Sequence, residues 1–238
     1  LNSIDGYRNK ISHFSLGFAK GKYFVPHWNK MLVVLDRLQN CFGQSSQAKE
    51  VNIYTYLSSL SAMDLKNSIR SIKDFPKKGV YYRDLNPIYL NPEAFKEVIN
   101  KLLAFAKSKS PNKIVSIESS GFIIGSVLAK ELGIGFAPIR KYGKLPFEVL
   151  RAHFPSDFRD TTLEIQLGAV KKNEKVIICD DLIATGGTAK VAAEMVEELG
   201  AKIVGIAAIA ELDYLKGREL LKQHELFTLI KFKKQNEI

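Results

Sequence analysis

The apolar positions between residues 91 and 106 predict a long amphipathic helix. Asn91 followed by Pro92 places a side-chain cap before a proline in the first helical turn. After this cap, apolar residues recur at intervals of three and four positions, which is the spacing of one helix face. These residues are Phe95, Val98, Ile99, Leu102, Leu103 and Ala106.

Two strand-helix-strand units follow this helix. The first has a β-branched run at 114–117, a helix over 121–132 that stops at Gly133, and a strand over 134–139. The second has a strand over 176–179, a helix over 188–199 that stops at Gly200, and a strand over 202–210. Because nearly continuous apolar strands alternate with helices, we predict an α/β fold: a doubly wound, mainly parallel sheet with helices on both faces.

The first sixty residues show no sustained helical or strand period. We therefore expect an N-terminal extension of unknown fold over residues 1–62 and a second domain over 63–238. The extension is basic and poor in acids, which is compatible with an organellar targeting segment. An unstructured arm, or sequence upstream of a start at Met63, explains it equally well.

Composition narrows the class of protein. The chain has 238 residues, of which 46% are hydrophobic, so it can bury a sizeable core. No apolar run reaches the length of a membrane-spanning helix, and we expect no membrane partner. The formal charge of +10 is spread along the chain without a nucleic-acid-binding module, so nucleic acid is a disfavoured partner. Cys41 and Cys179 form neither a disulfide framework nor a metal-ligand pattern, which favours a reducing compartment such as the cytoplasm.

The candidate chemistry is concentrated in the stretch VIICDDLIATGGTAK, residues 176–190. An apolar strand runs into two acids and then into a Thr-Gly-Gly-Thr turn that opens a helix. Such a turn has unpaired backbone N–H groups and the positive end of the helix dipole, and its glycines allow close approach of an anion. We call residues 184–188 the phosphate cradle: Ala184, Thr185, Gly186, Gly187 and Thr188. The stretch matches neither GxxxxGK[ST] nor GxGxxG.

The acids next to this cradle indicate what it holds. Asp180 and Asp181 would repel a bare anion, but they would accept hydrogen bonds from vicinal sugar hydroxyls. A ribose 5-phosphate satisfies both the acids and the cradle. The alternative is that the glycines only turn the chain and the acids only cap a helix. Ligands of doubly wound sheets bind at the carboxyl ends of strands, where both Glu118–Gly121 and the acid pair are predicted to lie.

The stretch resembles the phosphoribosyl pyrophosphate-binding loop of the type I phosphoribosyltransferases. Four further segments are similar, in the same order, to the adenine phosphoribosyltransferases of this family, and the likeness spans about residues 64–232. They are IRSIKDFPKKGVYYRDLNPIYLNPEAF from Ile69, GFAPIRKYGKLP from Gly135, LEIQLGAV from Leu163 and ELDYLKGRELL from Glu211. The resemblance divides residues 63–238 into a small hood, about 64–92, and a core, about 93–232.

The resemblance also implies roles for individual residues. Asp180 and Asp181 would bind the ribose hydroxyls, and the phosphate cradle would bind the 5-phosphate. In the hood, the chain near Tyr81 and Arg83 would bind the purine edge. Pyrophosphate would contact two loops, through Ser119, Ser120 and Gly121 and through Arg140, Lys141 and Lys144, of which Arg140 and Lys144 would also act in catalysis.

The implied reaction joins a purine, adenine first, to 5-phosphoribosyl 1-pyrophosphate, giving AMP and pyrophosphate through an oxocarbenium-like transition state. Mg²⁺ would arrive on the phosphoribosyl pyrophosphate, and we predict no dedicated protein metal site. Residues 147–162 are expected to form a flexible lid loop in which Asp157 stabilises the proton on the base. A homodimer is expected from the resemblance alone.

Two positions depart from the adenine pattern. The family's anion loop usually reads Ser-Arg-Gly-Phe, whereas this chain has Ser120 in place of the arginine, and the lid has Asp157-Phe158 where Glu-Tyr is usual. With Ser120, the stretch IESSG, residues 117–121, is also similar to the anion loop of xanthine phosphoribosyltransferases. Xanthine or another 6-oxopurine is therefore an alternative substrate, and a weakly active or non-catalytic regulatory protein of the same fold is an alternative function.

Overall fold

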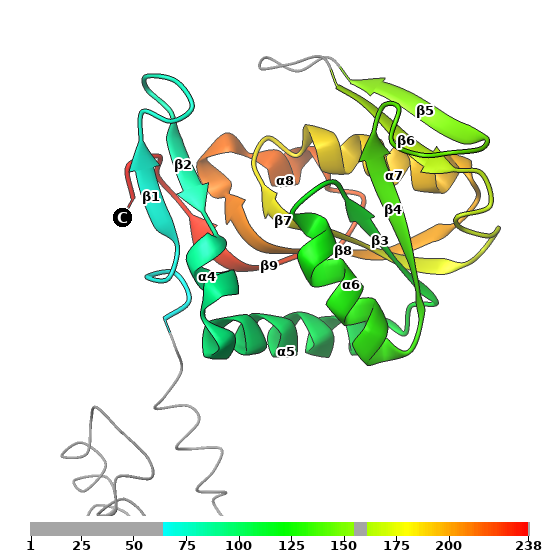
Figure 1. The fold of residues 1–238 in the computed structure, drawn as a ribbon, viewed down its shortest axis with the longest axis horizontal. Coiled ribbons are helices and arrows are strands. Elements are labelled where there is room, and N and C mark those ends of the chain that lie inside the picture. The colour runs from blue at the N-terminus through cyan, green and yellow to red at the C-terminus, as the bar shows by residue number, and fades with distance from the viewer. Residues whose placement is uncertain (1–63, 155–160, 238) are drawn as a thin grey trace, which may run out of the picture. The chain divides into compact units, whose positions relative to one another are not determined.

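The computed structural model of the chain describes residues 64–154 and 161–237, and a seven-stranded sheet lies at its centre (Figure 1). The strand order is β5-β6-β4-β3-β7-β8-β9. Neighbours from β4 to β9 are parallel, whereas β6 is antiparallel to both β4 and β5. The bounds are β3 Lys113–Ile117, β4 Gly135–Lys141, β5 Val149–Phe154, β6 Thr161–Gln166, β7 Lys175–Ile183, β8 Lys202–Leu212 and β9 Leu226–Phe232.

Helices cover both faces of this sheet, as predicted. Helices α5 (Pro92–Lys109) and α6 (Gly121–Leu132) pack on one face, and α7 (Gly187–Glu198) packs on the other (Figure 1). Strand β7 contributes to both cores, because Ile177 lies in the cluster with α5 and Ile178 in the cluster with α7. Short helices are α4 Asn86–Leu90, the 3₁₀ turn η1 Asp213–Leu215 and α8 Gly217–Leu220. In the described ranges, no helix is long and apolar enough to cross a membrane.

The predicted ends of the helices are confirmed. The Asn91 side chain accepts hydrogen bonds from the backbone N–H groups of Glu93 and Ala94, at 3.0 and 3.1 Å. Helix α6 ends at Gly133, whose φ of +67° lies in the left-handed region that glycine adopts without steric cost. These local signals fix where the helices lie between the strands.

The segment predicted as the hood, residues 64–92, contains an antiparallel pair of strands beside the main sheet (Figure 1). Strand β1 spans Arg70–Lys73 and β2 spans Tyr81–Asp84. A two-stranded sheet is marginal alone. Its flanking residues Leu65, Ile69 and Leu85 are buried in the same core cluster as α5.

Two predictions of loop structure were wrong. Strand β7 continues past Cys179 to Ile183, because the backbone of the acid pair stays in the ladder with β8, with Asp180 opposite Ala208. The bounds of the predicted lid loop, residues 147–162, were too wide, because 149–154 form β5 and 161–162 begin β6, with Val149 paired to Gln166; residues 155–160 lie outside the described residues.

Candidate active site

The acid pair lies in the second half of β7, half-buried at the edge of the core. The backbone N–H of Asp181 donates to Oδ1 of Asp180 over 2.9 Å, and the two carboxyl groups also interact with each other. Burial, reinforced by the charge of Asp181, raises the pKa of Asp180, and burial likewise raises the pKa of Asp181. The pair is therefore a poorly solvated acceptor site that gains from hydrogen-bond donors supplied by a ligand.

The loop between β3 and α6, the anion loop Glu118–Gly121, lies directly against this pair. A side chain on Gly121 would approach the Cys179 carbonyl oxygen to 2.9 Å and Oδ1 of Asp180 to 3.2 Å, so only glycine permits this contact. The Ser120 side chain does not cap α6 but hydrogen-bonds the Asp181 carboxylate, which lowers the pKa of Asp181 against the effect of burial. The Glu118–Ser119 peptide is cis. Ser119 is exposed beside these groups.

The phosphate cradle joins β7 to the first turn of α7. Gly186 has a φ of +80°, and a side chain there would overlap the carbonyl oxygen of Gly217, at the start of α8. Gly187 begins the helix, so the N–H groups of its first turn lack helical partners and can bind an anion. Thr185 is exposed and Thr188 is half-buried. The structure therefore has a glycine turn that opens a helix where the sequence indicated one, and phosphate binding there stays a prediction.

Two of the basic residues, Arg140 and Lys141, end β4 rather than lying in the loop after it, and Lys144 follows the strand, next to the anion loop. Arg140 Nε and the backbone N–H of Lys141 both donate to Oε2 of Glu118, over 3.1 and 3.0 Å. Burial alone would raise the pKa of Glu118, but these two hydrogen bonds lower it, so Glu118 stays charged and orients Arg140. Arg140 Nη1 also donates to the carbonyl oxygen of Lys144 at 3.3 Å, while the Lys141 and Lys144 side chains are exposed.

This arrangement has counterparts among known proteins. A sequence profile of the phosphoribosyl transferase domain matches residues 88–236, which contain the acid pair, the cradle and both loops. The chain belongs to the phosphoribosyl transferase family. Its curated relatives include the adenine phosphoribosyltransferase of Natranaerobius thermophilus, 45% identical over 170 residues, which cover 71% of this chain and 99% of the relative. That of Lactobacillus acidophilus is 43% identical over 171 residues, covering 72% and 98%.

Solved phosphoribosyltransferases share the fold as well. Adenine phosphoribosyltransferase from Thermoanaerobacter pseudethanolicus superposes with a TM-score of 0.68 at 40% identity, covering 71% of this chain and 98% of that one. The Saccharomyces cerevisiae enzyme, solved with adenine and an imino-altritol bisphosphate, has a TM-score of 0.68 at 38% identity, covering 72% and 99%. The predicted fold class and family are thereby confirmed.

In this phosphoribosyltransferase, consecutive residues of the hood strand β2 point in different directions. The Tyr82 side chain lies near the acid pair, because the charge of Asp181 adds to burial in raising the pKa of Tyr82. The Arg83 side chain is 3% exposed and points to the other side of β2, where it contacts residues after β9. Successive side chains on a strand point to opposite faces, so what Tyr81 and Arg83 can offer a base is their backbone.

Tyr89 is a site residue that the sequence did not single out. It lies on α4, packs edge-to-face on Phe95 at 5.9 Å, and its hydroxyl is buried without a hydrogen-bond partner among the described residues. Burial raises its pKa, and the charges of Asp181 and Asp180 raise it further, so this hydroxyl stays protonated near the acid pair. The only available signal was an aromatic residue at an apolar position of a short helix.

The described residues hold no group of three or more acidic, His or Cys side chains that could bind a metal by itself. The two carboxylates nevertheless fit Mg²⁺, which commonly takes one or two protein carboxylates and completes its shell with water and substrate phosphates. The predicted lid residues Asp157 and Phe158 lie outside the described residues.

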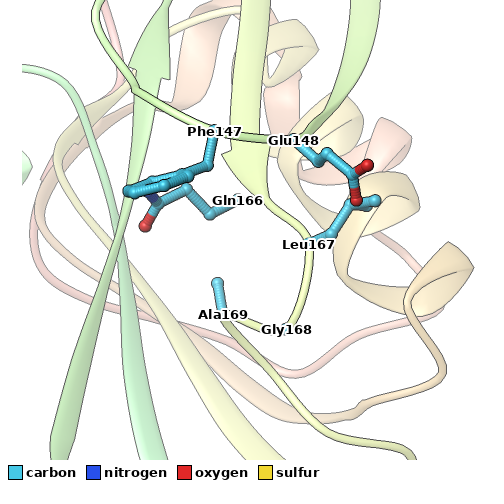
Figure 2. Close-up of a pocket in the computed structure, with 6 residues that line it drawn as sticks. All are labelled: Phe147, Glu148, Gln166, Leu167, Gly168 and Ala169. Carbon is cyan, nitrogen blue, oxygen red and sulfur yellow. The ribbon is translucent and has the colours of Figure 1, made fainter.

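A separate depression of about 550 Å³ opens at the base of the β5–β6 hairpin (Figure 2). Its lining includes Phe147, which is 92% exposed, and Gln166, whose side-chain amide donates to the Pro146 carbonyl oxygen over 3.1 Å. None of the predicted site residues lines it. We therefore assign the chemistry to the acid pair and its loops rather than to this depression.

Proposed function

We propose that the chain is an adenine phosphoribosyltransferase that converts adenine and 5-phosphoribosyl 1-pyrophosphate to AMP and pyrophosphate in purine salvage. The observation that carries this proposal is the acid pair of β7 placed directly before the N-terminal N–H groups of α7. The names of the curated relatives support adenine as the base.

We assign the sugar phosphate to β7 and α7. Asp180 and Asp181 accept hydrogen bonds from the two ribose hydroxyls, and the cradle N–H groups together with the Thr185 and Thr188 hydroxyls bind the 5-phosphate. Burial raises the pKa of both acids, which shows that folding removes water from their carboxyl groups. Hydroxyl donors from the sugar would replace the hydrogen bonds that this water made.

We assign the departing pyrophosphate to the anion loop and the basic loop. The backbone of Ser119–Gly121 offers N–H donors, and Arg140, Lys141 and Lys144 offer positive charge. When the bond between the anomeric carbon and pyrophosphate breaks, negative charge builds on the leaving group, and these cations stabilise it. A ring nitrogen of the base then forms the new bond to the same carbon and gives up its proton, for which Asp157 remains the proposed partner.

We assign the base to the space between the hood and the acid pair. One edge of β2 pairs with β1, and the backbone of Tyr81 and Arg83 on the opposite edge is proposed to read the purine, while the Tyr82 ring packs on it. Mg²⁺ carried on the substrate would neutralise phosphate charge. A cytoplasmic homodimer is part of this proposal, and light scattering of the purified chain checks the dimer.

The direct test is a substrate panel. The purified chain is incubated with phosphoribosyl pyrophosphate, Mg²⁺ and adenine, hypoxanthine, guanine or xanthine, and nucleotide formation is followed by chromatography. We expect AMP from adenine at a rate well above the other three bases. Preference for xanthine would assign the enzyme to 6-oxopurines, an outcome that Ser120 motivates. Tight binding of the sugar phosphate without any nucleotide product would indicate a non-catalytic regulator.

A further inference from the structure

The five residues after β9, Lys233–Glu237, here called the tail, fold back onto the hood. Their backbone carbonyl groups surround the guanidinium of Arg83 on β2. Nη1 donates to the Glu237 carbonyl oxygen at 2.5 Å, and Nη2 donates to those of Gln235 at 2.9 Å and Lys234 at 3.4 Å. The tail thus supplies most of the acceptors of a buried cation.

Arg83 is also fixed from two other sides. Its Nη1 contacts the Ser71 hydroxyl on β1, and its guanidinium lies over the Phe232 ring, 4.0 Å from the ring centroid. Burial lowers the pKa of Arg83, while the hydroxyls and carboxylate nearby, of Tyr214, Glu237 and Tyr81, oppose that shift. The side chain therefore connects the hood, the last strand of the core and the tail.

Other contacts join the tail to the two ends of the hairpin. Lys66 Nζ, before β1, donates to Oε1 of Glu237 at 2.5 Å and to the Lys231 carbonyl oxygen at 3.0 Å. In the turn between β1 and β2, the Gly79 carbonyl oxygen accepts from the Gln235 side-chain amide at 2.7 Å. Figure 1 shows the end of the chain next to β1.

These contacts matter because β1 and β2 form a sheet of only two strands, which side chains must hold in place. If a buried guanidinium loses its hydrogen-bond acceptors, the free-energy cost of removing its charge from water is no longer offset. Without the tail, Arg83 would have to turn toward solvent, and β2 would move with it. Tyr82 is the next residue on β2, so the surface proposed to pack on the base would move as well.

We infer that the tail is a positioning element for the purine. The Arg83 side chain binds the tail and holds β2 in place, so Arg83 is a positioning residue and its side chain does not contact the base. The tail would set the height of the hood above the acid pair without touching substrate. This inference rests on the proposed position of the base beneath the hood.

The test compares the full chain with a variant that lacks residues 234–238. We expect the KM for adenine to rise about tenfold, the effect of losing charge-assisted hydrogen bonds on a local equilibrium. The KM for phosphoribosyl pyrophosphate should stay within about twofold, because the acid pair and the cradle lie on β7 and α7. Lys234→Ala is the matched control, since it keeps every backbone acceptor of Arg83, and it should behave as the full chain.

Hydrogen exchange supplies a readout that does not depend on activity. Backbone amides of residues 70–84 should exchange about tenfold faster in the shortened chain, with residues 176–190 unchanged. Equal changes in both KM values, or unchanged exchange in the hood, would overturn the inference. If the shortened chain does not fold, Arg83→Lys answers the same question, because it keeps the charge and loses the forked geometry.

The same experiment separates this inference from the proposed function. In the full chain, added adenine should slow exchange of residues 81–84. If adenine leaves these amides unprotected while deletion of the tail still releases the hood, the tail holds the hood but the base lies elsewhere.

Discussion

The sugar-phosphate half of the proposed site lies on strands and helices of the central sheet, whereas the base half lies on a two-stranded sheet outside it. Residues flanking the acid pair, such as Cys179 and Ile183, are buried, and the cradle packs on Gly217. The hood is anchored in the core by the residues that flank its strands, which are Leu65, Ile69 and Leu85. Its strands are otherwise held by Arg83, Lys66 and the tail. The proposed sugar-phosphate chemistry thus rests on core packing, whereas the proposed recognition of the base rests on a peripheral hairpin that can shift separately.

The largest effect should come from removing both charges of the acid pair. Asp180→Asn with Asp181→Asn should lower kcat/KM by on the order of 10²- to 10³-fold, the loss typical of a group that stabilises the transition state. Because burial raises the pKa of both acids, their ionised forms oppose folding at neutral pH, so the variant should melt at the same or a higher temperature. Steady-state kinetics with a thermal melt checks both expectations. Near-normal turnover would show that the ribose assignment is wrong.

Next in size is the cradle, for which the chain offers a matched pair of glycines. Gly186 and Gly168 both have a φ of +80°, but only at Gly186 would a side chain overlap a neighbour, Gly217. Each Ala variant should lose about 1 kcal/mol of stability from the left-handed backbone, and Gly186→Ala should lose more, because its methyl group would overlap the Gly217 carbonyl oxygen. Gly186→Ala alone should also raise the KM for phosphoribosyl pyrophosphate about tenfold or more. Equal KM values for the two variants would argue against the cradle.

A smaller effect should come from Ser120, the position that departs from the family pattern. Its hydrogen bond lowers the pKa of Asp181, so Ser120→Ala should raise that pKa and leave less carboxylate as the pH falls. The acid limb of the profile of kcat/KM should then move to higher pH, with a loss of about two- to fivefold near its midpoint. A profile from about pH 4 to pH 8 with matched ionic strength tests this. An unmoved acid limb would show that Ser120 does not tune the pKa of Asp181.

The smallest effect should come from removing the charge of Glu237, one of the residues that connect the tail to the hood. Hydrogen bonding to Lys66 lowers the pKa of Glu237 from its ordinary 4.5 to about 2. A depressed folded-state pKa means that the carboxylate stabilises the fold above pH 4.5 and that this contribution disappears as the pH falls toward 2. Glu237→Gln should melt slightly lower than the full chain at neutral pH and equally at low pH. A constant difference at every pH would show that the charge is not involved.

The same contrast explains what the sequence could predict. Helix caps, glycine stops and the acids before a glycine turn are local signals, so α5, α6, α7 and the position of the acid pair followed from residues near in sequence. The partners of Arg83 are carbonyl groups about 150 positions later, which no local pattern encodes. Tyr89 was missed for the same reason, because only the fold brings its hydroxyl near Asp180 and Asp181.

The alternating directions of Tyr82 and Arg83 restrict how the hood can evolve. They are consecutive on β2, with the ring toward the acid pair and the guanidinium toward the tail. Inserting or deleting one residue before them, without a compensating change, would exchange their sides of the sheet. Related chains should therefore tolerate replacement of the ring more readily than a change in the length of the turn at residues 74–80.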